Sequence, residues 1–267
     1  MTNIKFRIGG NIAMTNELID NYKNIDFIFL DTVNSTNTYC KEIGESGFNK
    51  DTIVISDTQS NGKGTKGRSW ISPKGKGLWF SMLLKPSIKL NDINFLTILT
   101  STALHNTFLN FGINTKIKWP NDIYLNTKKL CGILTESKIY NNKVEYVVIG
   151  IGINLNLELN DFNDELQNKA TSLFITIGKY FKREEILNKF LENFYEQYNE
   201  LLKGYKNNIL KIYKNNSLII NREVSLEYKN SIRRVIPTDI LEDGSLLIKN
   251  TNNTTEKIIS GEISILL

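Results

Sequence analysis

The chain has 267 residues, of which 40% are hydrophobic and 23% charged, with a net charge of +5. That length allows one large domain or a medium domain with a small one, and the charge is too small to indicate nucleic-acid binding by itself. Two cysteines without a CxxC motif argue against a disulfide framework or a zinc cluster, and a single histidine argues against His-rich metal sites and a Ser-His-Asp triad. The sequence has neither an apolar run of membrane-spanning length nor a signal-peptide core. We therefore expect a cytoplasmic protein with no membrane partner.

The N-terminal part predicts one strand and one helix. Residues 1–26 are weakly patterned and are treated as an extension, with a short helix expected at Asn16–Tyr22. Phe27–Leu30 is a continuous apolar run, typical of a buried strand. A helix is expected to follow and to end near Gly44 or Gly47, since glycine is common just after a helix.

Three polar residues, Ser35, Thr36 and Asn37, separate this strand from this helix. Such side chains cap helix N-termini. They could equally bind a ligand at the carboxyl end of the strand, and the sequence leaves both interpretations open.

The glycine loop, Thr58–Trp70, follows the apolar run Ile53–Ile55. Glycine lets the backbone approach a ligand closely, and exposed N–H groups with fixed positive charge make a cradle for an anion. Both features coincide here, because three glycines alternate with three cationic residues: Gly62, Lys63, Gly64, Lys66, Gly67 and Arg68. We predict a phosphate or carboxylate site; the alternative is a solvated basic loop.

The same loop nearly matches the phosphate-binding P-loop pattern, but a P-loop must open a helix. Pro73, further glycines and the β-prone run Leu78–Leu84 follow instead. We therefore expect a glycine-rich loop between two strands.

The rest of the chain predicts two long helices and a series of strands. His105 lies inside the first helix and is expected to be structural. Gly132 lies in a strand, where glycine suggests close approach of a ligand or of backbone. Gly150 and Gly152 are two apart in another strand and therefore face one side, which suggests a surface that something presses against. The expected helices are Asn91–Gly112, Glu184–Lys203 and a short piece at Ile209–Tyr213. The expected strands are Lys116–Lys118, Ile123–Leu125, Leu130–Glu136, Val144–Asn156, Val224–Tyr228, Arg233–Asp239, Ser245–Lys249 and Lys257–Ser260.

The cationic residues suit a reaction that holds several anions at once. Adenylate formation is one, because a carboxylate, an α-phosphate and a leaving pyrophosphate must be bound together. Lys118 ends a strand at a turn, where its ammonium can be fixed, and the glycine loop could close over a nucleotide and exclude water. Asn121, Asp122 and Asn154 could orient phosphates, ribose or Mg²⁺.

Five motifs together resemble those of biotin protein ligases, in the same order. They are Asp31-x3-Ser35-Thr36-Asn37, Gln59-x2-Gly62-Lys63-Gly64-x2-Gly67-Arg68-x-Trp70, Lys118-Trp119-Pro120-Asn121-Asp122, Lys129-Leu130-x-Gly132-Ile133-Leu134-x-Glu136 and Gly150-x-Gly152-Ile153-Asn154. The ending Gly261-Glu262-Ile263-Ser264 is also similar to that of the family. The resemblance implies a ligase that makes biotinyl-5′-AMP from biotin and ATP. It then transfers biotin to a lysine of a biotin carboxyl carrier domain of a biotin-dependent carboxylase.

The resemblance also implies the site residues. Biotin contacts are expected at Ser35, Thr36, Asn37, Gln59, Gly62, Lys63, Gly64, Thr65, Lys118 and Gly132. ATP contacts are expected at Lys66, Arg68, Trp70, Asn121, Lys129 and Asn154, and Lys118 and Arg68 are the expected catalytic residues. Trp70 could instead be a packing residue. A Mg²⁺ ion held mainly by phosphates needs only one or two protein carboxylates, and no metal ligand is assigned.

The resemblance to biotin protein ligases also implies an α+β fold. It comprises a mixed-sheet catalytic domain of the biotin/lipoate ligase type over residues 27–213 and a small SH3-like β-barrel domain over 214–267. A homodimer is possible and no specific DNA partner is expected. Only 26 residues precede Phe27, so we expect a monofunctional ligase without the winged-helix repressor domain of some family members; specific operator binding in a gel shift would contradict this.

Two departures concern the glycine loop. The family often carries Arg where this chain has Lys63 and Thr65. Lys63 keeps the charge but loses bidentate geometry, and Thr65 removes a charge. We hypothesise that this enzyme releases some of its adenylate.

Two alternatives remain. A lipoate ligase is related in fold, but its loop typically includes a histidine, which this loop lacks. An RNA- or DNA-binding protein could use the basic stretch from 58 to 91 and the C-terminal barrel, with steeply salt-dependent affinity. This would leave the KWPND motif and the paired glycines 150 and 152 unexplained.

Overall fold

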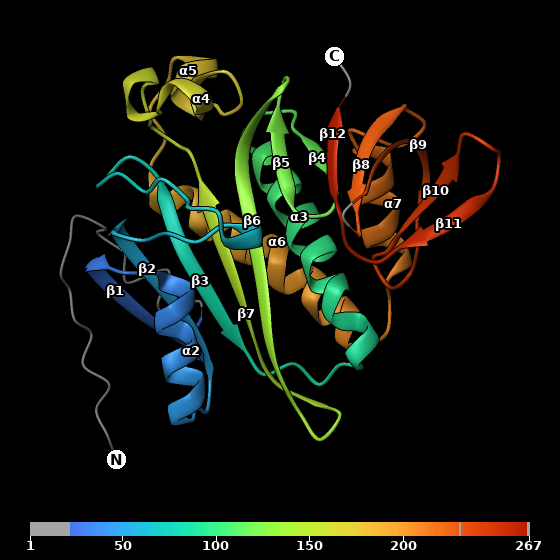
Figure 1. Cartoon of the computed structure of the whole chain (residues 1–267). Coiled ribbons are helices and arrows are strands. Elements are labelled where there is room, and N and C mark those ends of the chain that lie inside the picture. Colours follow the sequence, from blue (N-terminus) through green and yellow to red (C-terminus); the bar gives the residue numbers. More distant parts are fainter. Residues whose placement is uncertain (1–21, 230, 266–267) are drawn as a thin grey trace.

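The computed structural model describes residues 22–229 and 231–265, which form two sheets (Figure 1). The larger is a seven-stranded mixed sheet of order β1-β2-β3-β7-β6-β5-β4, and the smaller a five-stranded sheet of order β11-β10-β9-β8-β12. This confirms the predicted fold class of a mixed-sheet domain with a small C-terminal β module. The predicted helix Asn16–Tyr22 and most of the 1–26 extension lie outside the described residues.

The large sheet is parallel at one edge only. β1 and β2 are parallel and are joined through α2 (Thr36–Ser46), as a parallel pair requires a crossover; the other neighbours are antiparallel. The glycine loop joins β2 to β3 and opens no α-helix, which confirms that it is not a P-loop. The strands are β1 (Ile25–Val33), β2 (Asp51–Gln59), β3 (Leu78–Leu84), β4 (Lys116–Lys118), β5 (Asp122–Leu125), β6 (Lys128–Tyr140) and β7 (Lys143–Ile153).

Helices cover both faces of this sheet (Figure 1). α2 packs on one face through a small cluster that includes Cys40, Val54 and Val148. On the other face α3 (Ile93–Asn110), α6 (Arg183–Leu202) and α7 (Asn207–Asn215) form the main core, as their helical apolar spacing predicts. None of the helices in the described part of the chain is long and apolar enough to cross a membrane.

Two short helices between β7 and α6 were not predicted. They are α4 (Asp164–Gln167) and α5 (Leu173–Ile177). Each begins at a side-chain cap, because Asn163 accepts from the Leu166 N–H and Ser172 from the Ile175 N–H. Helices this short show no apolar periodicity, so only their caps could have revealed them.

The C-terminal module is a meander whose last strand returns to its first. It comprises β8 (Val224–Tyr228), β9 (Ser231–Ile240), β10 (Leu246–Asn250), β11 (Thr255–Ile258) and β12 (Glu262–Ile265), and β12 pairs with β8. β12 was not predicted as a strand. The module is joined to the large sheet by backbone bonds from Ile117 to Asn216 and from Leu218 to Ile117. The indole of Trp119 also donates to the Gly244 carbonyl, at 3.0 Å. The module therefore stands beside the β4–β5 turn.

Candidate active site

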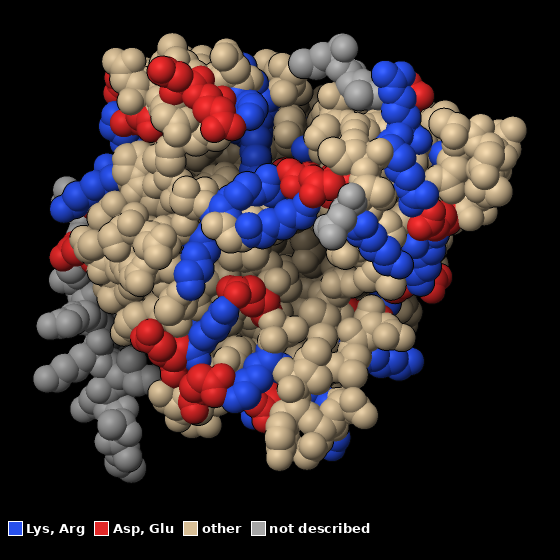
Figure 2. Space-filling model, viewed as in Figure 1, with Lys and Arg blue, Asp and Glu red and all other residues tan. Residues whose placement is uncertain are grey.

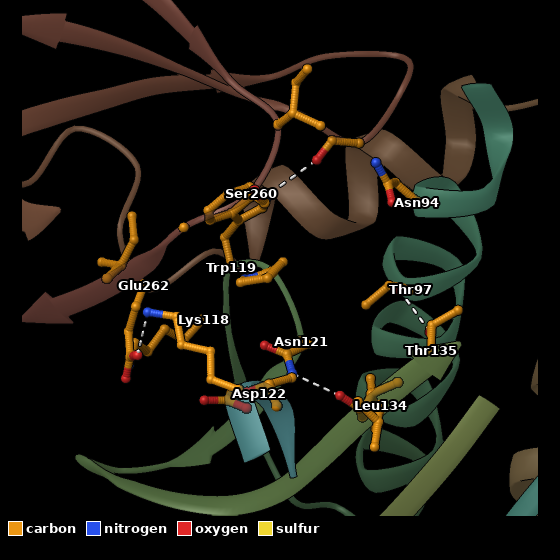
Figure 3. A pocket seen from close by; sticks show the side chains of 18 of the residues that line it. Asn94, Thr97, Lys118, Trp119, Asn121, Asp122, Leu134, Thr135, Ser260 and Glu262 are labelled. Atoms are coloured by element: carbon orange, nitrogen blue, oxygen red, sulfur yellow. Dashed lines mark hydrogen bonds and ion pairs between the residues drawn. The ribbon is translucent and has the colours of Figure 1, made fainter. Parts of the chain in front are cut away.

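Two cavities adjoin on the face of the molecule that carries the glycine loop. The inner pocket, of about 40 Å³, lies between the start of α2, the glycine loop, the first half of β6 and the end of β7. The outer cleft, of about 900 Å³, lies between the glycine loop, the β4–β5 turn, the start of α3 and the C-terminal module (Figure 3). Four residues line both cavities and so mark where they meet: Thr65, Asn121, Ile133 and Leu134.

Most residues expected at a biotin site line the inner pocket: Ser35, Thr36, Asn37, Gln59, Lys63, Gly64, Thr65 and Gly132. Gly62 and Lys118 do not line it. Trp70, Asn121 and Lys129, which were expected on the nucleotide side, do. Lys66, Arg68 and Lys118 line the outer cleft, where Figure 3 shows Lys118 on the same side as Glu262.

The start of α2 is capped from another strand. Ser35 occupies the N-cap position, but its side chain makes no capping bond. Gln59 supplies that bond instead, because its Oε1 accepts from the Thr36 N–H at 2.9 Å and from the Thr36 hydroxyl at 3.1 Å. Of the two interpretations that the sequence left open for this polar run, side-chain capping by Ser35 is not observed, and ligand binding stays a prediction.

Asn37 joins α2 to the sheet beneath the inner pocket. Its Nδ2 donates to Glu136 Oε2 at 2.9 Å and to the Leu134 carbonyl at 3.3 Å. Its Oδ1 accepts from the buried Ser81 hydroxyl at 2.6 Å. A Cβ on Gly150 would collide with that Oδ1. Gly150 is thus required by Asn37, which confirms for this glycine the expectation that something presses on its surface.

Trp70 presses on the other two strand glycines. A Cβ on Gly132 would lie 2.8 Å from its ring, and one on Gly152 would collide with its Nε1. The Lys129 ammonium lies 5.3 Å from the centre of an indole ring, so a cation–π contact helps to hold both side chains. The buried Nε1 of Trp70 has no hydrogen-bond partner.

Lys118 and Lys129 stand close to one carboxylate. Lys129 forms an ion pair with Asp122 at 2.6 Å, with both side chains less than a third exposed. The Lys118 ammonium lies 3.4 Å from the Tyr124 hydroxyl. Burial lowers the pKa of Lys118; the charges of Lys129 and Arg68 also lower it, while Asp122 and Glu262 raise it. Several charges therefore converge where β4 and β5 meet the cleft.

The glycine loop is a small hairpin rather than an open cradle. Gly64 donates to the Arg68 carbonyl at 2.7 Å and Trp70 to the Gly62 carbonyl at 2.8 Å. At its tip Lys66 and Gly67 both have positive φ, as a tight hairpin turn requires. These two N–H groups are committed within the loop and cannot bind an anion as they stand. The anion site of the glycine loop stays a prediction.

Two other predicted residues have structural partners. The Asn121 amide donates to the Ile133 carbonyl at 2.7 Å, which fixes the β4–β5 turn against β6. Asn154 is buried, lines neither cavity and donates to the Thr171 carbonyl at 3.0 Å. Its contact with ATP stays a prediction. His105 is buried against Thr115, at 3.0 Å between Nδ1 and Oγ1, which confirms its structural role.

The site also uses residues to which the sequence analysis assigned no role. Ser81 and Glu136 complete the Asn37 network, and Glu227 and Glu262 line the outer cleft. Ser81 lies in an otherwise apolar strand, a signal that could have found it. Glu262 belongs to the family-like ending Gly261–Ser264, which was a signal for it, whereas Glu227 had none. Figure 2 shows Lys and Arg side chains running across this face to a group of Asp and Glu side chains beside a hollow.

Comparison with known proteins agrees with this geometry. Residues 29–154 match the biotin/lipoate A/B protein ligase family. Over 239 residues the chain is 34% identical to the bifunctional ligase/repressor BirA of Bacillus subtilis, covering 89% of this chain and 73% of that protein. The chain belongs to this ligase family.

Solved structures give the same result. The biotin protein ligase of Aquifex aeolicus in complex with biotin and ATP is similar to this ligase-family chain with a TM-score of 0.76 and 28% identity. The match covers 90% of this chain and 97% of that one. A biotin–[acetyl-CoA-carboxylase] ligase of Paracoccus denitrificans is 35% identical over 105 residues, which are 38% of this chain and 43% of that protein. The resemblance to biotin protein ligases seen in the motifs is confirmed.

Proposed function

We propose that this protein activates biotin with ATP to biotinyl-5′-AMP and then transfers biotin to a lysine of a biotin carboxyl carrier domain. The observation that carries the proposal is the junction of two unlike cavities at Thr65 and Asn121. One is narrow and lined by polar side chains, as suits a small acid. The other is wide and its lining includes Lys66, Arg68 and Lys118, cationic side chains that suit a nucleoside triphosphate.

In the first step a carboxylate oxygen of biotin attacks the α-phosphorus of ATP, and the bond from that phosphorus to the bridging oxygen breaks. Pyrophosphate leaves. We assign Lys129 to the substrate carboxylate, because it lines the inner pocket and Asp122 holds it at 2.6 Å. We assign Lys118 to the α-phosphate, because it faces the outer cleft. Both cations offset charge that builds up around phosphorus in the transition state.

In the second step the carrier lysine, as a neutral amine, attacks the carbonyl carbon of the adenylate. The amide bond forms, AMP leaves and the amine loses a proton. The mixed anhydride must stay dry until then, and the glycine loop with Trp70 covers the inner pocket from one side.

Mg²⁺ would enter with the phosphates of ATP. In the described part of the chain, no group of three or more His, Cys, Asp or Glu could hold a metal ion by itself. A Mg²⁺ ion that is bound mainly through phosphate oxygens and water needs no such group. We therefore assign no protein ligand to the ion.

The domain division is part of the proposal. Residues 27–213 would hold the biotin and ATP sites, and residues 214–267 would close the outer cleft and help to receive the carrier. We place the protein in the cytoplasm, where ATP is available and where the two buried, unpaired cysteines would stay reduced. Homodimer formation and the absence of a specific DNA partner stay predictions.

Mass spectrometry of an isolated biotin carboxyl carrier domain tests the whole reaction. Incubated with the protein, ATP, Mg²⁺ and either biotin or lipoate, the domain should gain one biotinyl group on its acceptor lysine and no lipoyl group. A carrier with that lysine changed to Arg is the control. A carrier that gains lipoate but not biotin would favour the lipoate ligase alternative.

A further inference from the structure

Two cationic residues of the glycine loop are already bound by the C-terminal module. Arg68 pairs with Glu262 at 2.7 Å, and Lys66 pairs with Glu262 at 3.1 Å and with Glu227 at 3.3 Å. More than 190 residues of chain separate Arg68 from Glu262, so the contact exists only because the module stands beside the loop.

The two glutamates, here called the carboxylate pair, are held in an unfavourable arrangement. Glu262 on β12 lies directly opposite Glu227 on β8 in the antiparallel register. Like charges directly opposite on neighbouring strands destabilise a sheet. Lys66 bridges them and offsets this repulsion. Burial acts to raise the pKa of Glu262, but its bonds from Arg68 and Lys66 lower it overall, which is consistent with a carboxylate that stays charged.

The loop is shaped to meet the carboxylate pair. Lys66 is a non-glycine residue with φ of 55°, a conformation that costs energy for most side chains. It lies at the tip of the hairpin and reaches both carboxylates from there. The Arg68 guanidinium is held on three sides: Nε donates to the Thr65 carbonyl at 3.2 Å, Nη2 to the Thr65 hydroxyl at 2.9 Å and Nη1 to Glu262.

We propose that the carboxylate pair Glu227–Glu262 is a latch that holds Lys66 and Arg68 in the place of nucleotide phosphates, and that ATP binding requires these cations to change partners. Glu227 and Glu262 are then positioning residues, which act on the reaction through the loop. The proposal rests on the function proposed above, since it assumes that phosphates enter the outer cleft.

The exchange has a thermodynamic consequence. A loop that is mostly latched is available to phosphate for only a fraction of the time. The apparent affinity for nucleotide equals the affinity of the unlatched loop multiplied by that fraction. After AMP leaves, the carboxylate pair recaptures the loop and opens the cleft. The latch therefore lowers affinity for nucleotide and restores the same loop position after each turnover.

The test compares Glu262→Gln and Glu227→Gln with a matched control, Glu256→Gln. Glu256 belongs to the same module and pairs with Arg233 at 2.6 Å, and its side chain is 37% exposed against 31% for Glu262. The probe is α,β-methylene-ATP, which cannot release pyrophosphate, titrated by calorimetry in the presence of biotin and Mg²⁺. Because exposed ion pairs are individually weak, we expect Kd to fall about three- to tenfold in Glu262→Gln, less in Glu227→Gln, and to stay unchanged in the control.

Limited trypsin digestion gives a second readout that needs no activity. Cleavage after Lys66 and Arg68 should be faster in Glu262→Gln than in the wild type without ligand, and the analogue should suppress it in both. Unchanged or weaker analogue binding in Glu262→Gln, an equal change in the control, or unchanged cleavage would each overturn the latch. A wild-type protein that binds neither biotin nor the analogue would instead overturn the proposed function. In that case the ligand-free cleavage rates of Glu262→Gln and the wild type would still test whether the carboxylate pair holds the loop.

Discussion

Asn37 of α2 occupies the space that a side chain on Gly150 of β7 would fill. Its Oδ1 accepts a bond at 2.6 Å from Ser81, which pairs with Gly150 across β3 and β7, so the amide is held directly over that glycine. The inner pocket therefore depends on the absence of a single methyl group.

Gly150→Ala should displace Asn37 and break its bonds to Ser81 and Glu136. We expect the free energy of unfolding to fall by about 1–3 kcal/mol, as for other overpacked sites, and the KM for biotin to rise more than the KM for ATP. Thermal unfolding and pyrophosphate release would measure the two effects. The double variant Asn37→Ala/Gly150→Ala removes the collision and should recover stability without recovering the biotin KM; recovery of neither would show that another contact forbids the side chain.

Lys118→Ala should reduce the rate of adenylation on the order of 10²–10³-fold, as for loss of a donor to the transition state. Lys116→Ala, on the same short strand but outside both cavities, is the control and should have little effect. A near-normal rate for Lys118→Ala would remove Lys118 from its role.

The pH dependence follows from the lowered pKa of Lys118. Burial favours the neutral amine, so the ammonium is lost as pH rises through a value below that of an ordinary lysine. The adenylation rate should therefore decline on the alkaline side at a lower pH than 10.5, the ordinary lysine value. Lys118→Arg should keep some activity and move this decline to higher pH, because arginine stays charged. A profile that is the same in both would assign the titration to another group.

Trp70 should report ligand binding. The other two tryptophans, Trp79 and Trp119, are 0% and 1% exposed, whereas Trp70 is only partly buried and lines the inner pocket. Biotin should change the intrinsic fluorescence of the wild type and not that of Trp70→Phe, while calorimetry confirms that the variant still binds. An equal change in both proteins would place the ligand away from Trp70.

This protein should retain its adenylate weakly, because Thr65 stands where the family often carries an arginine. Thr65 lies at the junction of the two cavities and its neutral hydroxyl accepts from Arg68. Free biotinyl-AMP should appear in the filtrate after rapid dilution without carrier, and Lys63→Arg should lower its release by up to about tenfold through bidentate geometry. A wild-type protein that retains all of its adenylate would contradict the hypothesis.

Local signals in the sequence predicted most of the fold. Apolar periodicity placed α3 and α6 to within two residues at each end, and β8 was placed at its observed bounds. The signal was absent for α4 and α5, which are too short to show a period, and for β12, whose pairing with β8 is a tertiary contact.

The site was predicted in its parts but not in its arrangement. The glycines of β6 and β7 indicated close approach, and Asn37 and Trp70 supply it. Nothing local to Gln59 indicates that it caps a helix 23 residues earlier. The sequence likewise could not distinguish the positions of Lys118 and Lys129, because the two lysines approach Asp122 of β5 from the strands on either side of it, β4 and β6.

The central claim is that this protein adenylates biotin. Pyrophosphate release from ATP, measured without any carrier and with biotin, lipoate or no acid added, tests it most directly. The account predicts release that requires biotin and that neither lipoate nor ATP alone supports. Release supported equally by lipoate, or no release with biotin even after a biotin carboxyl carrier domain is added, would contradict it.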